Sequence, residues 1–291
     1  MFFGSIPALV TPFRHGEVDA DAFCHLVEWQ IESGSSALVP CGTTGESATL
    51  SFEEHYRVIE LCIEAARGRV PVIAGCGSND TATAARHMSF AKAAGATAAL
   101  VVAPYYNRPN QDGIYAHYAH LADNCDLPII VYNVPARTVT DIQPDTMARL
   151  AKIPTIVGVK DASGIVSRVT SHRLGCGSDF VQLSGNDEMA LTFNAAGGLG
   201  CISVTANVAP KLCAEFQAAS ASGDTVRAHE LNDRLYPLHL ALFSDASPGP
   251  TKYAMSRVAE WMTPDLRLPM TPPSEASRAA VDAALKIAGL L

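Results

Sequence analysis

Residues 156–160 form a short apolar run that ends in Lys160, and the chain turns polar only after it. Burial at such a position lowers the pKa of a lysine, because an apolar environment penalises the charged ammonium group. The neutral amine can attack a ketone or an aldehyde and form a Schiff base. The alternative is a lysine that extends to solvent or pairs with a carboxylate, and position alone leaves both interpretations open.

The other lysines of the chain occupy less apolar settings. They fall inside expected helices, in a loop, or near helix starts that follow prolines, so we expect all five to be solvated: Lys92, Lys152, Lys211, Lys252 and Lys286. Lys160 is the one lysine that this interpretation places at the end of an apolar strand. It is our candidate nucleophile.

A second group of reactive side chains lies in residues 42–47, with the sequence GTTGES. Thr43 and Thr44 supply hydroxyl groups, and the two glycines allow a tight turn with several backbone N–H groups. Such a turn can bind an anion, and here a carboxylate is more plausible than a phosphate. The alternative is an ordinary loop between a strand and a helix.

Phenol and guanidinium groups follow two further apolar runs. Tyr106 and Tyr132, together with the hydroxyl of Thr43, can pass protons to and from a Schiff-base intermediate. Arg137 can hold a substrate carboxylate with its planar fork. Simple aromatic packing and a solvated loop arginine are the corresponding alternatives.

These residues come at the ends of recurring apolar segments that we interpret as strands. The expected strands are residues 5–10, 37–39, 70–74, 98–102, 129–132, 156–160, 180–183 and 200–204. Segments with helical spacing follow them: residues 20–33, 51–66, 81–94, 112–124, 144–151, 165–174, 188–196 and 209–219. Ser51 and Glu54 form a plausible capping box, and Pro144 suits a first helical turn.

The pattern favours an α/β fold, a (β/α)8 TIM barrel with a C-terminal helical extension. Near-continuous apolar strands are typical of a parallel sheet that is covered on both faces. Eight strand–helix units in a row favour a closed barrel over an open sheet. We expect a catalytic barrel in residues 1–225 and a helical region in 226–291 packed on it. The active site of this fold lies at the carboxyl ends of the strands.

Composition narrows the possible partners and the location. A formal net charge of −8 argues against a nucleic-acid partner. The 8 cysteines are scattered without a CxxC pair, which is typical of free thiols in a reducing compartment. No apolar segment approaches the roughly 20 residues of a membrane span. We expect a cytoplasmic protein that binds neither nucleic acid nor a membrane.

Six motifs in this order resemble the dihydrodipicolinate synthase family, within the class I pyruvate-dependent aldolase and lyase group: PCGTTGES, PYYNRP, YNVPART, VGVKDASG, LSGND and CISVTANV. Each motif lies at the end of an expected strand, and the resemblance spans nearly the whole chain. It implies an enzyme of lysine and diaminopimelate biosynthesis that condenses pyruvate with L-aspartate 4-semialdehyde, without a metal or organic cofactor.

The resemblance also implies roles for individual residues. Lys160 matches the lysine that captures pyruvate as a Schiff base. Thr43, Tyr132 and Tyr106 match a proton relay, in which the tyrosine at 106 reaches in from a neighbouring subunit. At least a dimer is then required, and the family is often a homotetramer built from two such dimers.

Further positions match the substrate-binding residues of the family. Thr44 corresponds to the site of the pyruvate carboxylate, and Arg137 to the entrance arginine that holds the carboxylate of aspartate semialdehyde. Gly185 and Ile202 match backbone positions that line the pocket. The alternative within this group is an aldolase or lyase for a 2-keto sugar acid. Relatives that cleave sialic acid typically carry serine-threonine at 43–44 and lack an arginine at 137.

A non-catalytic barrel that only binds a keto acid is an alternative of another class. The presence of Lys160 and its three proposed relay residues argues against it.

The regulatory positions of the family are only partly present. Positions that fit a lysine-binding site at the dimer interface are Ser47, Ala48, His55, Asn79 and Tyr105. Phe52 and Thr83 depart from the pattern, because sensitive members have a histidine or lysine and a glutamate there. Without that glutamate the ammonium of lysine would be buried unpaired, which is costly. We therefore expect weak or absent inhibition by lysine. Residues 246–250, ASPGP, also depart, and their distance along the chain suggests a structural role.

Overall fold

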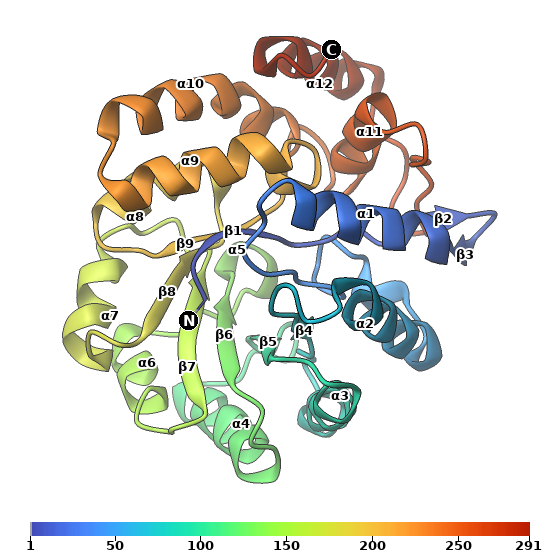
Figure 1. Ribbon diagram of the computed structural model, residues 1–291. Helices are drawn as coiled ribbons and strands as arrows, with labels where there is room; N and C mark the ends of the chain where they lie inside the picture. The colour runs from blue at the N-terminus through green and yellow to red at the C-terminus, as the bar shows by residue number, and fades with distance from the viewer. Residues whose placement is uncertain (1) are drawn as a thin grey trace.

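The computed structural model describes residues 2–291 and contains a parallel sheet that curls around a central axis (Figure 1). The order of its seven strands is β1 (Gly4–Pro7), β9 (Gly200–Ser203), β8 (Val181–Ser184), β7 (Ile156–Asp161), β6 (Ile129–Asn133), β5 (Ala98–Val102) and β4 (Ile73–Gly75). All neighbouring strands of this sheet run parallel. The order follows the chain around the axis, as in a (β/α)8 barrel.

A short segment closes the sheet between its two outer strands, β1 and β4. The N–H of Val39 donates to the carbonyl of Pro7 (3.0 Å), and the N–H of Ile73 donates to the carbonyl of Leu38 (2.8 Å). Each side contributes only an isolated parallel bridge, so the segment is shorter than a regular strand. It nevertheless occupies the position of the strand expected at 37–39, and the predicted eight-membered barrel is confirmed.

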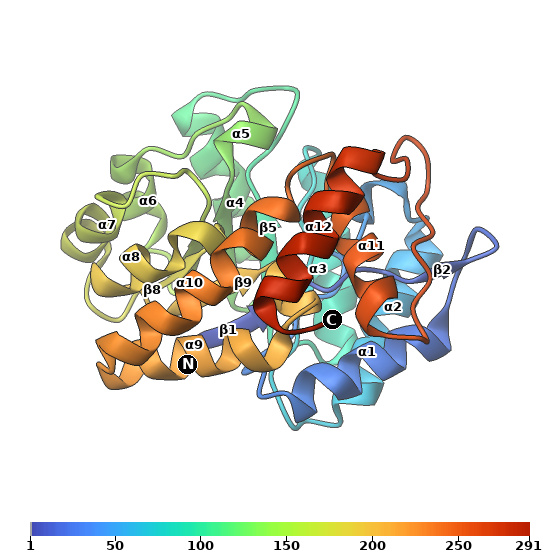
Figure 2. The ribbon, with the colours of Figure 1, turned by 90° about the horizontal axis from the view of Figure 1, so that it is seen from above.

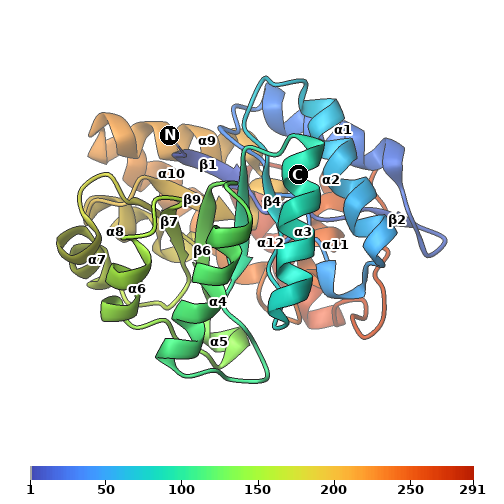
Figure 3. The ribbon, with the colours of Figure 1, turned by 90° about the horizontal axis from the view of Figure 1, so that it is seen from below.

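Helices surround the barrel in the expected alternation. They are α1 (Ala20–Glu32), α2 (Phe52–Ala66), α3 (Thr81–Ala94), α4 (Gln111–Asn124), α6 (Pro144–Leu150), α7 (Arg168–Cys176), α8 (Ala190–Ala195) and α9 (Pro210–Ser222). Figure 3 shows α2, α3 and α4 next to one another on one side of the barrel. The capping box of Ser51 and Glu54 is present, and Pro144 begins α6. Helix α7 begins later than predicted, because the side chain of Ser163 accepts a hydrogen bond from Ile165 N in a preceding turn.

Several short elements in the barrel part of the chain were not predicted. A small hairpin, β2 (Phe13–Arg14) and β3 (Glu17–Val18), follows the first barrel strand. A single-turn helix, α5 (Pro135–Thr138), follows β6. Both are too short to produce a periodic pattern in the sequence.

The apolar core is divided by the sheet into an inner and an outer cluster. The inner cluster fills the barrel and includes Ile6, Val39, Ile73, Leu100, Ile130, Tyr132, Leu183 and Ile202. The outer cluster lies between the strands and the surrounding helices and includes Leu9, Phe23, Ile59, Met88, Ile129, Val131 and Val159. Successive residues of a strand therefore point alternately into the inner and the outer cluster. Because both faces of the strand are buried, its sequence is a continuous apolar run.

Strand β7 contains a bulge just before Lys160. Ile129 pairs with Ile156, but Ile130 pairs with Gly158, so Val157 is an extra residue on β7. Val157 packs with the inner cluster, whereas Val159 belongs to the outer one. An unbroken apolar run carries no alternation from which this register shift could be predicted.

The C-terminal region is helical, as expected. It consists of α10 (Thr225–Ala241), α11 (Gly249–Val258) and α12 (Glu275–Ala288). Helix α10 packs against α9 and α12, and Figure 2 shows α12 lying beside α11 over one side of the barrel. The division of the chain into domains at residue 225 stays a prediction. No helix in the described part of the chain is long and apolar enough to cross a membrane.

We predict that position 158 requires glycine, because the backbone of β8 approaches β7 closely there. A Cβ atom at Gly158 would lie 2.5 Å from the carbonyl oxygen of Val181, so β7 would have to move. We expect Gly158→Ala to lower the free energy of unfolding by about 3 kcal/mol in urea denaturation, through overpacking against backbone. The control is Gly68→Ala, which has open space but a φ of +71° and should cost only about 1 kcal/mol. Equal losses in the two variants would contradict this explanation.

Candidate active site

Lys160 lies at the carboxyl end of β7 with its side chain buried against the neighbouring strand. Only 5% of the residue is exposed. It pairs in register with Tyr132 of β6, and its Nζ lies 4.3 Å from the centroid of the Tyr132 ring. Within residues 2–291 the amine takes part in no ion pair or hydrogen bond. The predicted combination of burial and freedom from a carboxylate partner is thus present at this residue.

The prediction that all other lysines are solvated is wrong for Lys252. This residue of α11 is fully buried, with Nζ 2.5 Å from Oε1 of Glu46 and 2.8 Å from the carbonyl oxygen of Asp265. Burial lowers the pKa of Lys252 to about 8, and the charge of Glu46 opposes that shift. The groups that bury Lys252 come from distant parts of the chain, so local sequence gave no sign of them. The four remaining lysines are exposed.

Pairing separates the two buried lysines chemically. Lys252 is held by a carboxylate and a carbonyl group, and an amine in such a pair is stabilised as the ammonium ion. Lys160 has the Tyr132 ring beside its amine and no carboxylate or carbonyl partner among residues 2–291. Of the two, Lys160 is the one whose surroundings suit a nucleophile.

The GTTGE segment folds into a tight turn at the carboxyl end of the closing segment. Gly45 N donates to the Gly42 carbonyl and Glu46 N to the Thr43 carbonyl, both at 3.1 Å. The hydroxyl of Thr11 donates to the Gly45 carbonyl at 2.7 Å and ties the turn to the chain after β1. A Cβ atom at Gly45 would lie 2.9 Å from a backbone oxygen, so glycine is needed for this close approach.

The two threonines of this turn face different surroundings. Thr44 is buried, whereas Thr43 is exposed and lines a cavity. Over the described residues, the backbone N–H groups of Thr43 and Thr44 have no intramolecular acceptor. A carboxylate can accept hydrogen bonds from unpaired N–H groups of this kind. The N–H groups of these two residues are therefore the candidates for the predicted anion site. The N–H groups of Gly45 and Glu46, which follow them, already donate within the turn.

Tyr106 is far more exposed than Tyr132, the other tyrosine of the predicted relay. It is 87% exposed and has a φ of +70°, in a loop that Asn107 ties to the carbonyl of Asn79 at 2.8 Å. Its phenol therefore has few contacts with its own chain. Participation of Tyr106 in the site of a neighbouring subunit stays a prediction.

Arg137 lies on α5 at the wall of a cavity of about 710 Å³. Thr43, Val134 and Thr138 line the same cavity. The predicted entrance arginine and one predicted relay residue, Thr43, therefore border one space. Lys160 itself is not part of the wall and lies deeper in the barrel. Residues 245–248 also line the cavity although they are far from Thr43 and Arg137 along the chain, and the structural role expected for 246–250 stays a prediction.

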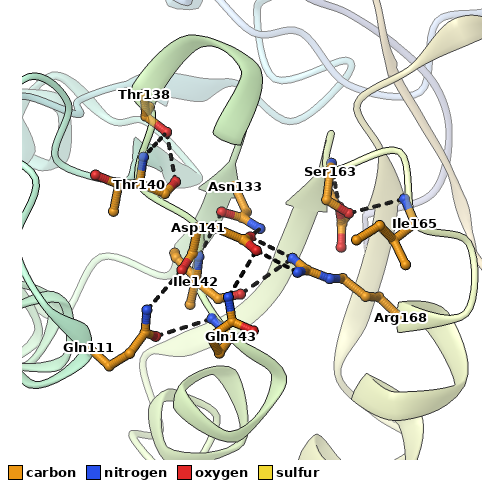
Figure 4. A network of polar contacts seen from close by, with 11 residues as sticks. Gln111, Asn133, Thr138, Thr140, Asp141, Ile142, Gln143, Ser163, Ile165 and Arg168 are labelled. Carbon is orange, nitrogen blue, oxygen red and sulfur yellow. Dashed lines mark hydrogen bonds and ion pairs between the residues drawn. The ribbon is translucent and has the colours of Figure 1, made fainter.

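A polar network holds the chain that carries Arg137 (Figure 4). Arg168 of α7 donates two hydrogen bonds of 2.6 Å to the carboxylate of Asp141. Asn133, the last residue of β6, donates to Asp141 at 2.9 Å and accepts from Ile142 N at 3.0 Å. Burial by itself would raise the pKa of Asp141, but the hydrogen bonds from Arg168 and Asn133 hold it below its usual value. Asp141, near the end of the loop after β6, is thus bound both by Arg168 and by Asn133 at the start of the loop, so the two ends are held together.

Gly185 follows β8 and Ile202 lies in β9, and neither lines the cavity of Arg137, so their role in lining the pocket stays a prediction. A Cβ atom at Gly185 would be 3.1 Å from Cε of Lys160 and 2.7 Å from Cβ of Ala162, so glycine leaves room for the lysine. The N–H of Gly185 donates to the carbonyl of Asp161 at 2.7 Å. Ile202 is fully buried in the inner cluster on β9.

Asp187 is a buried charged residue that the sequence reasoning did not single out. Its carboxylate accepts hydrogen bonds from Val204 N (2.8 Å), Thr205 N (3.2 Å) and the hydroxyl of Ser203. These bonds hold the turn that follows β9, directly after Ile202. The motif LSGND contains this residue, and an acidic side chain after a buried strand was the available signal.

The positions of the family's regulatory site border the other end of the same cavity. Its wall there includes Ser47, Ala48, Phe52, His55, Thr83, His87 and Tyr105, whereas Asn79 is not part of it. The rings of His55 and His87 stack with centroids 4.2 Å apart, and Phe52 lies 5.3 Å from His87. Burial lowers the pKa of His55, and it lowers the pKa of His87 to about 4. Both imidazoles are therefore neutral near pH 7, and they form an aromatic part of the cavity wall with Phe52, over whose ring the guanidinium of Arg86 lies at 4.3 Å.

Residues 1–288 match the model of the Dihydrodipicolinate synthetase family. The chain belongs to this family. A protein of Rhizorhabdus wittichii named 4-hydroxy-tetrahydrodipicolinate synthase is 70% identical, with 100% of each chain covered. The pyruvate complex of a chloride-inhibited dihydrodipicolinate synthase from Acinetobacter baumannii is 44% identical with a TM-score of 0.97, again over 100% of both chains. A lysine-bound family enzyme from Cyanidioschyzon merolae is 35% identical with a TM-score of 0.96, over 100% of this chain and 99% of that one.

Membership confirms the resemblance and the barrel with its C-terminal helices. The family identity also explains why the motifs gather at one end of the sheet, because each lies in a loop at a strand's carboxyl end. The roles of the individual site residues stay predictions.

Proposed function

We propose that Lys160, Thr43, Tyr132 and Tyr106 carry out the 4-hydroxy-tetrahydrodipicolinate synthase reaction of this enzyme. The observation that carries the proposal is the unpaired, buried amine of Lys160 at the carboxyl end of β7. The whole-chain similarity to relatives of that name supports the same activity.

In the proposed reaction the amine of Lys160 attacks the ketone carbon of pyruvate, and loss of water leaves a Schiff base. Loss of a methyl proton gives an enamine, whose carbon attacks the aldehyde carbon of L-aspartate 4-semialdehyde. The amine of the second substrate then attacks the former ketone carbon, closes the ring and releases Lys160. Tyr132, Thr43 and Tyr106 pass the protons that these steps require.

The substrate carboxylates have separate binding groups in this proposal. The unpaired N–H groups of Thr43 and Thr44 donate hydrogen bonds to the carboxylate of pyruvate, close to the barrel end. Gly185 and Ile202 line the space beside it. Arg137, at the cavity wall, holds the carboxylate of the semialdehyde. The alternative substrate, a 2-keto sugar acid, is disfavoured by the threonine pair at 43–44 together with Arg137.

The assembly and location are also proposals. The exposed phenol of Tyr106 supports a dimer in which each subunit completes the other's site, and the family suggests a homotetramer of two such dimers. All eight cysteines are free thiols, which supports a cytoplasmic location.

The central test is trapping of the Schiff base. Incubation with pyruvate followed by borohydride should reduce the imine to a stable adduct, and peptide mapping by mass spectrometry should locate it on Lys160. Lys160→Met should abolish the adduct, whereas Lys211→Met, a change at an exposed lysine, should leave it intact. No adduct in the wild-type enzyme, or an adduct on another lysine, would remove the centre of the proposal.

Arg137 provides the test of the second substrate. We expect Arg137→Ala to lower kcat/KM for L-aspartate 4-semialdehyde about 100-fold, because a charge-assisted contact to its carboxylate is lost. Borohydride trapping with pyruvate should be unchanged. The control is Arg149→Ala, which removes an exposed arginine that pairs with Asp112. Equal activity of Arg137→Ala and this control toward the semialdehyde would speak for the sugar-acid alternative.

We further propose that lysine is a weak inhibitor or none. Ser47, Ala48, His55 and Tyr105 remain at the cavity, but Thr83 replaces the expected glutamate, and its hydroxyl already donates to Asp80 at 2.6 Å. The two carboxylates in the cavity wall already have partners, Glu46 in Lys252 and Asp245 in the N–H groups of Ala246 and Ser274, so none is free for the second ammonium group of lysine.

Calorimetry should therefore detect no tight binding of lysine, and Thr83→Glu should strengthen binding by restoring a carboxylate. Tight binding to the wild-type enzyme, together with strong inhibition, would be incompatible with this proposal.

A further inference from the structure

Glu46 has an unusual backbone conformation in the turn that carries Thr43 and Thr44. Its φ and ψ are +52° and +35°, in the left-handed region that is unfavourable for residues with a side chain. Glu46 is not glycine, and its position directly ends the GTTG turn through the hydrogen bond from its N–H to the Thr43 carbonyl. The surrounding structure must hold this conformation in place.

The side chain of Glu46 is held by two groups from the C-terminal region. Its carboxylate is buried, with Oε1 2.5 Å from Nζ of Lys252 and Oε2 accepting from the N–H of Arg267 at 3.1 Å. The contact with Lys252 is a close ion pair without the alignment of a hydrogen bond. Glu46, which also lines the cavity, is thus fixed by two residues of the C-terminal region.

Lys252 is held just as firmly as the carboxylate that it contacts. Its Nζ lies 4.1 Å from the centroid of the Phe13 ring and donates to the carbonyl of Asp265. Arg267 lies over the same ring at 4.4 Å, and its guanidinium pairs with Glu54 of α2. Two cations and two carboxylates therefore form a compact group between the turn, the start of α2 and α11.

Lys252 also belongs to the segment that forms one wall of the cavity. Helix α11 begins at Gly249, directly after residues 245–248, which line the cavity together with Thr43 and Arg137. Lys252 does not line the cavity itself. Any effect that it has on a bound substrate must pass through the residues that it holds.

We propose that Lys252 is a positioning residue that, through Glu46, fixes the turn whose Thr43 and Thr44 groups receive the carboxylate of pyruvate. The proposal deepens the function proposed above and rests on it. Burying an ion pair contributes little net stability compared with apolar packing, but removing one partner leaves a costly unpaired charge. Loss of Lys252 should therefore drive the Glu46 carboxylate toward solvent and displace the turn.

The test compares four variants: Lys252→Met, Glu46→Gln, the double variant, and Lys286→Met as a control at an exposed lysine of α12. The pyruvate concentration that gives half-maximal borohydride trapping at Lys160 is measured for each, together with kcat, KM for both substrates and the melting temperature. Trapping in the wild-type enzyme tests the proposed function, and the differences among variants test the positioning role.

We expect Lys252→Met to raise the half-saturating pyruvate concentration and the KM for pyruvate at least tenfold, because a small displacement of binding groups has a large effect. The KM for the semialdehyde should change less, since Arg137 is held by the separate Asp141 network. The double variant should lie closer to the wild type than Lys252→Met, because no unpaired carboxylate remains. Lys286→Met should match the wild type.

Unchanged pyruvate saturation in folded Lys252→Met would overturn the proposal, as would effects of the two single changes that simply add in the double variant. If Lys252→Met fails to fold, Glu46→Gln and the double variant decide: the proposal requires weakened pyruvate saturation in Glu46→Gln at a temperature where that variant is folded, because an unpaired Lys252 also lowers its melting temperature. A lowered melting temperature with wild-type pyruvate saturation would show a purely structural ion pair.

Discussion

Closure of the parallel barrel is the constraint on which the site depends. The bridges at Leu38 and Val39 join β1 to β4 and complete the ring of hydrogen bonds. In a closed parallel barrel every strand delivers its carboxyl end to the same rim. Lateral pairing then makes Tyr132 and Lys160 direct neighbours, because their strands share a fixed register. Closure also sets the point at which the GTTGE turn leaves the barrel.

Buried or half-buried carboxylates hold the loops that follow the carboxyl ends of the strands. Asp141 is bound by Arg168 in the loop after β6, and Asp187 accepts the backbone N–H groups of the turn after β9. Glu46 pairs with Lys252 behind the turn after the closing segment. Loop backbone that is withdrawn from water needs polar partners, and a buried charge needs a counter-charge or several donors. Each of these loops is therefore held by a carboxylate that binds a cation or backbone N–H groups.

The two buried lysines illustrate how pairing separates structural from chemical roles. Lys252, with Glu46 and the Asp265 carbonyl beside it, is committed to an ion pair. Lys160 has the Tyr132 ring as its neighbour, and its amine has no hydrogen-bond or ion-pair partner among residues 2–291. Burial is therefore an insufficient criterion for a reactive lysine. The absence of a carboxylate partner among the described residues is what distinguishes Lys160, the proposed nucleophile, from Lys252.

The sequence by itself determined the alternation of strands and helices and the residues at the strand ends, including Lys160 and Arg137. Those features are local, because continuous apolar runs, helical spacing and caps record which faces of a segment are buried. Tertiary structure alone decided the bulge before Lys160, the exposure of Tyr106, the burial of Lys252 and the approach of residues 245–248 to the cavity. Each of these depends on contacts between segments far apart in the chain, and such contacts leave no periodic pattern in either segment.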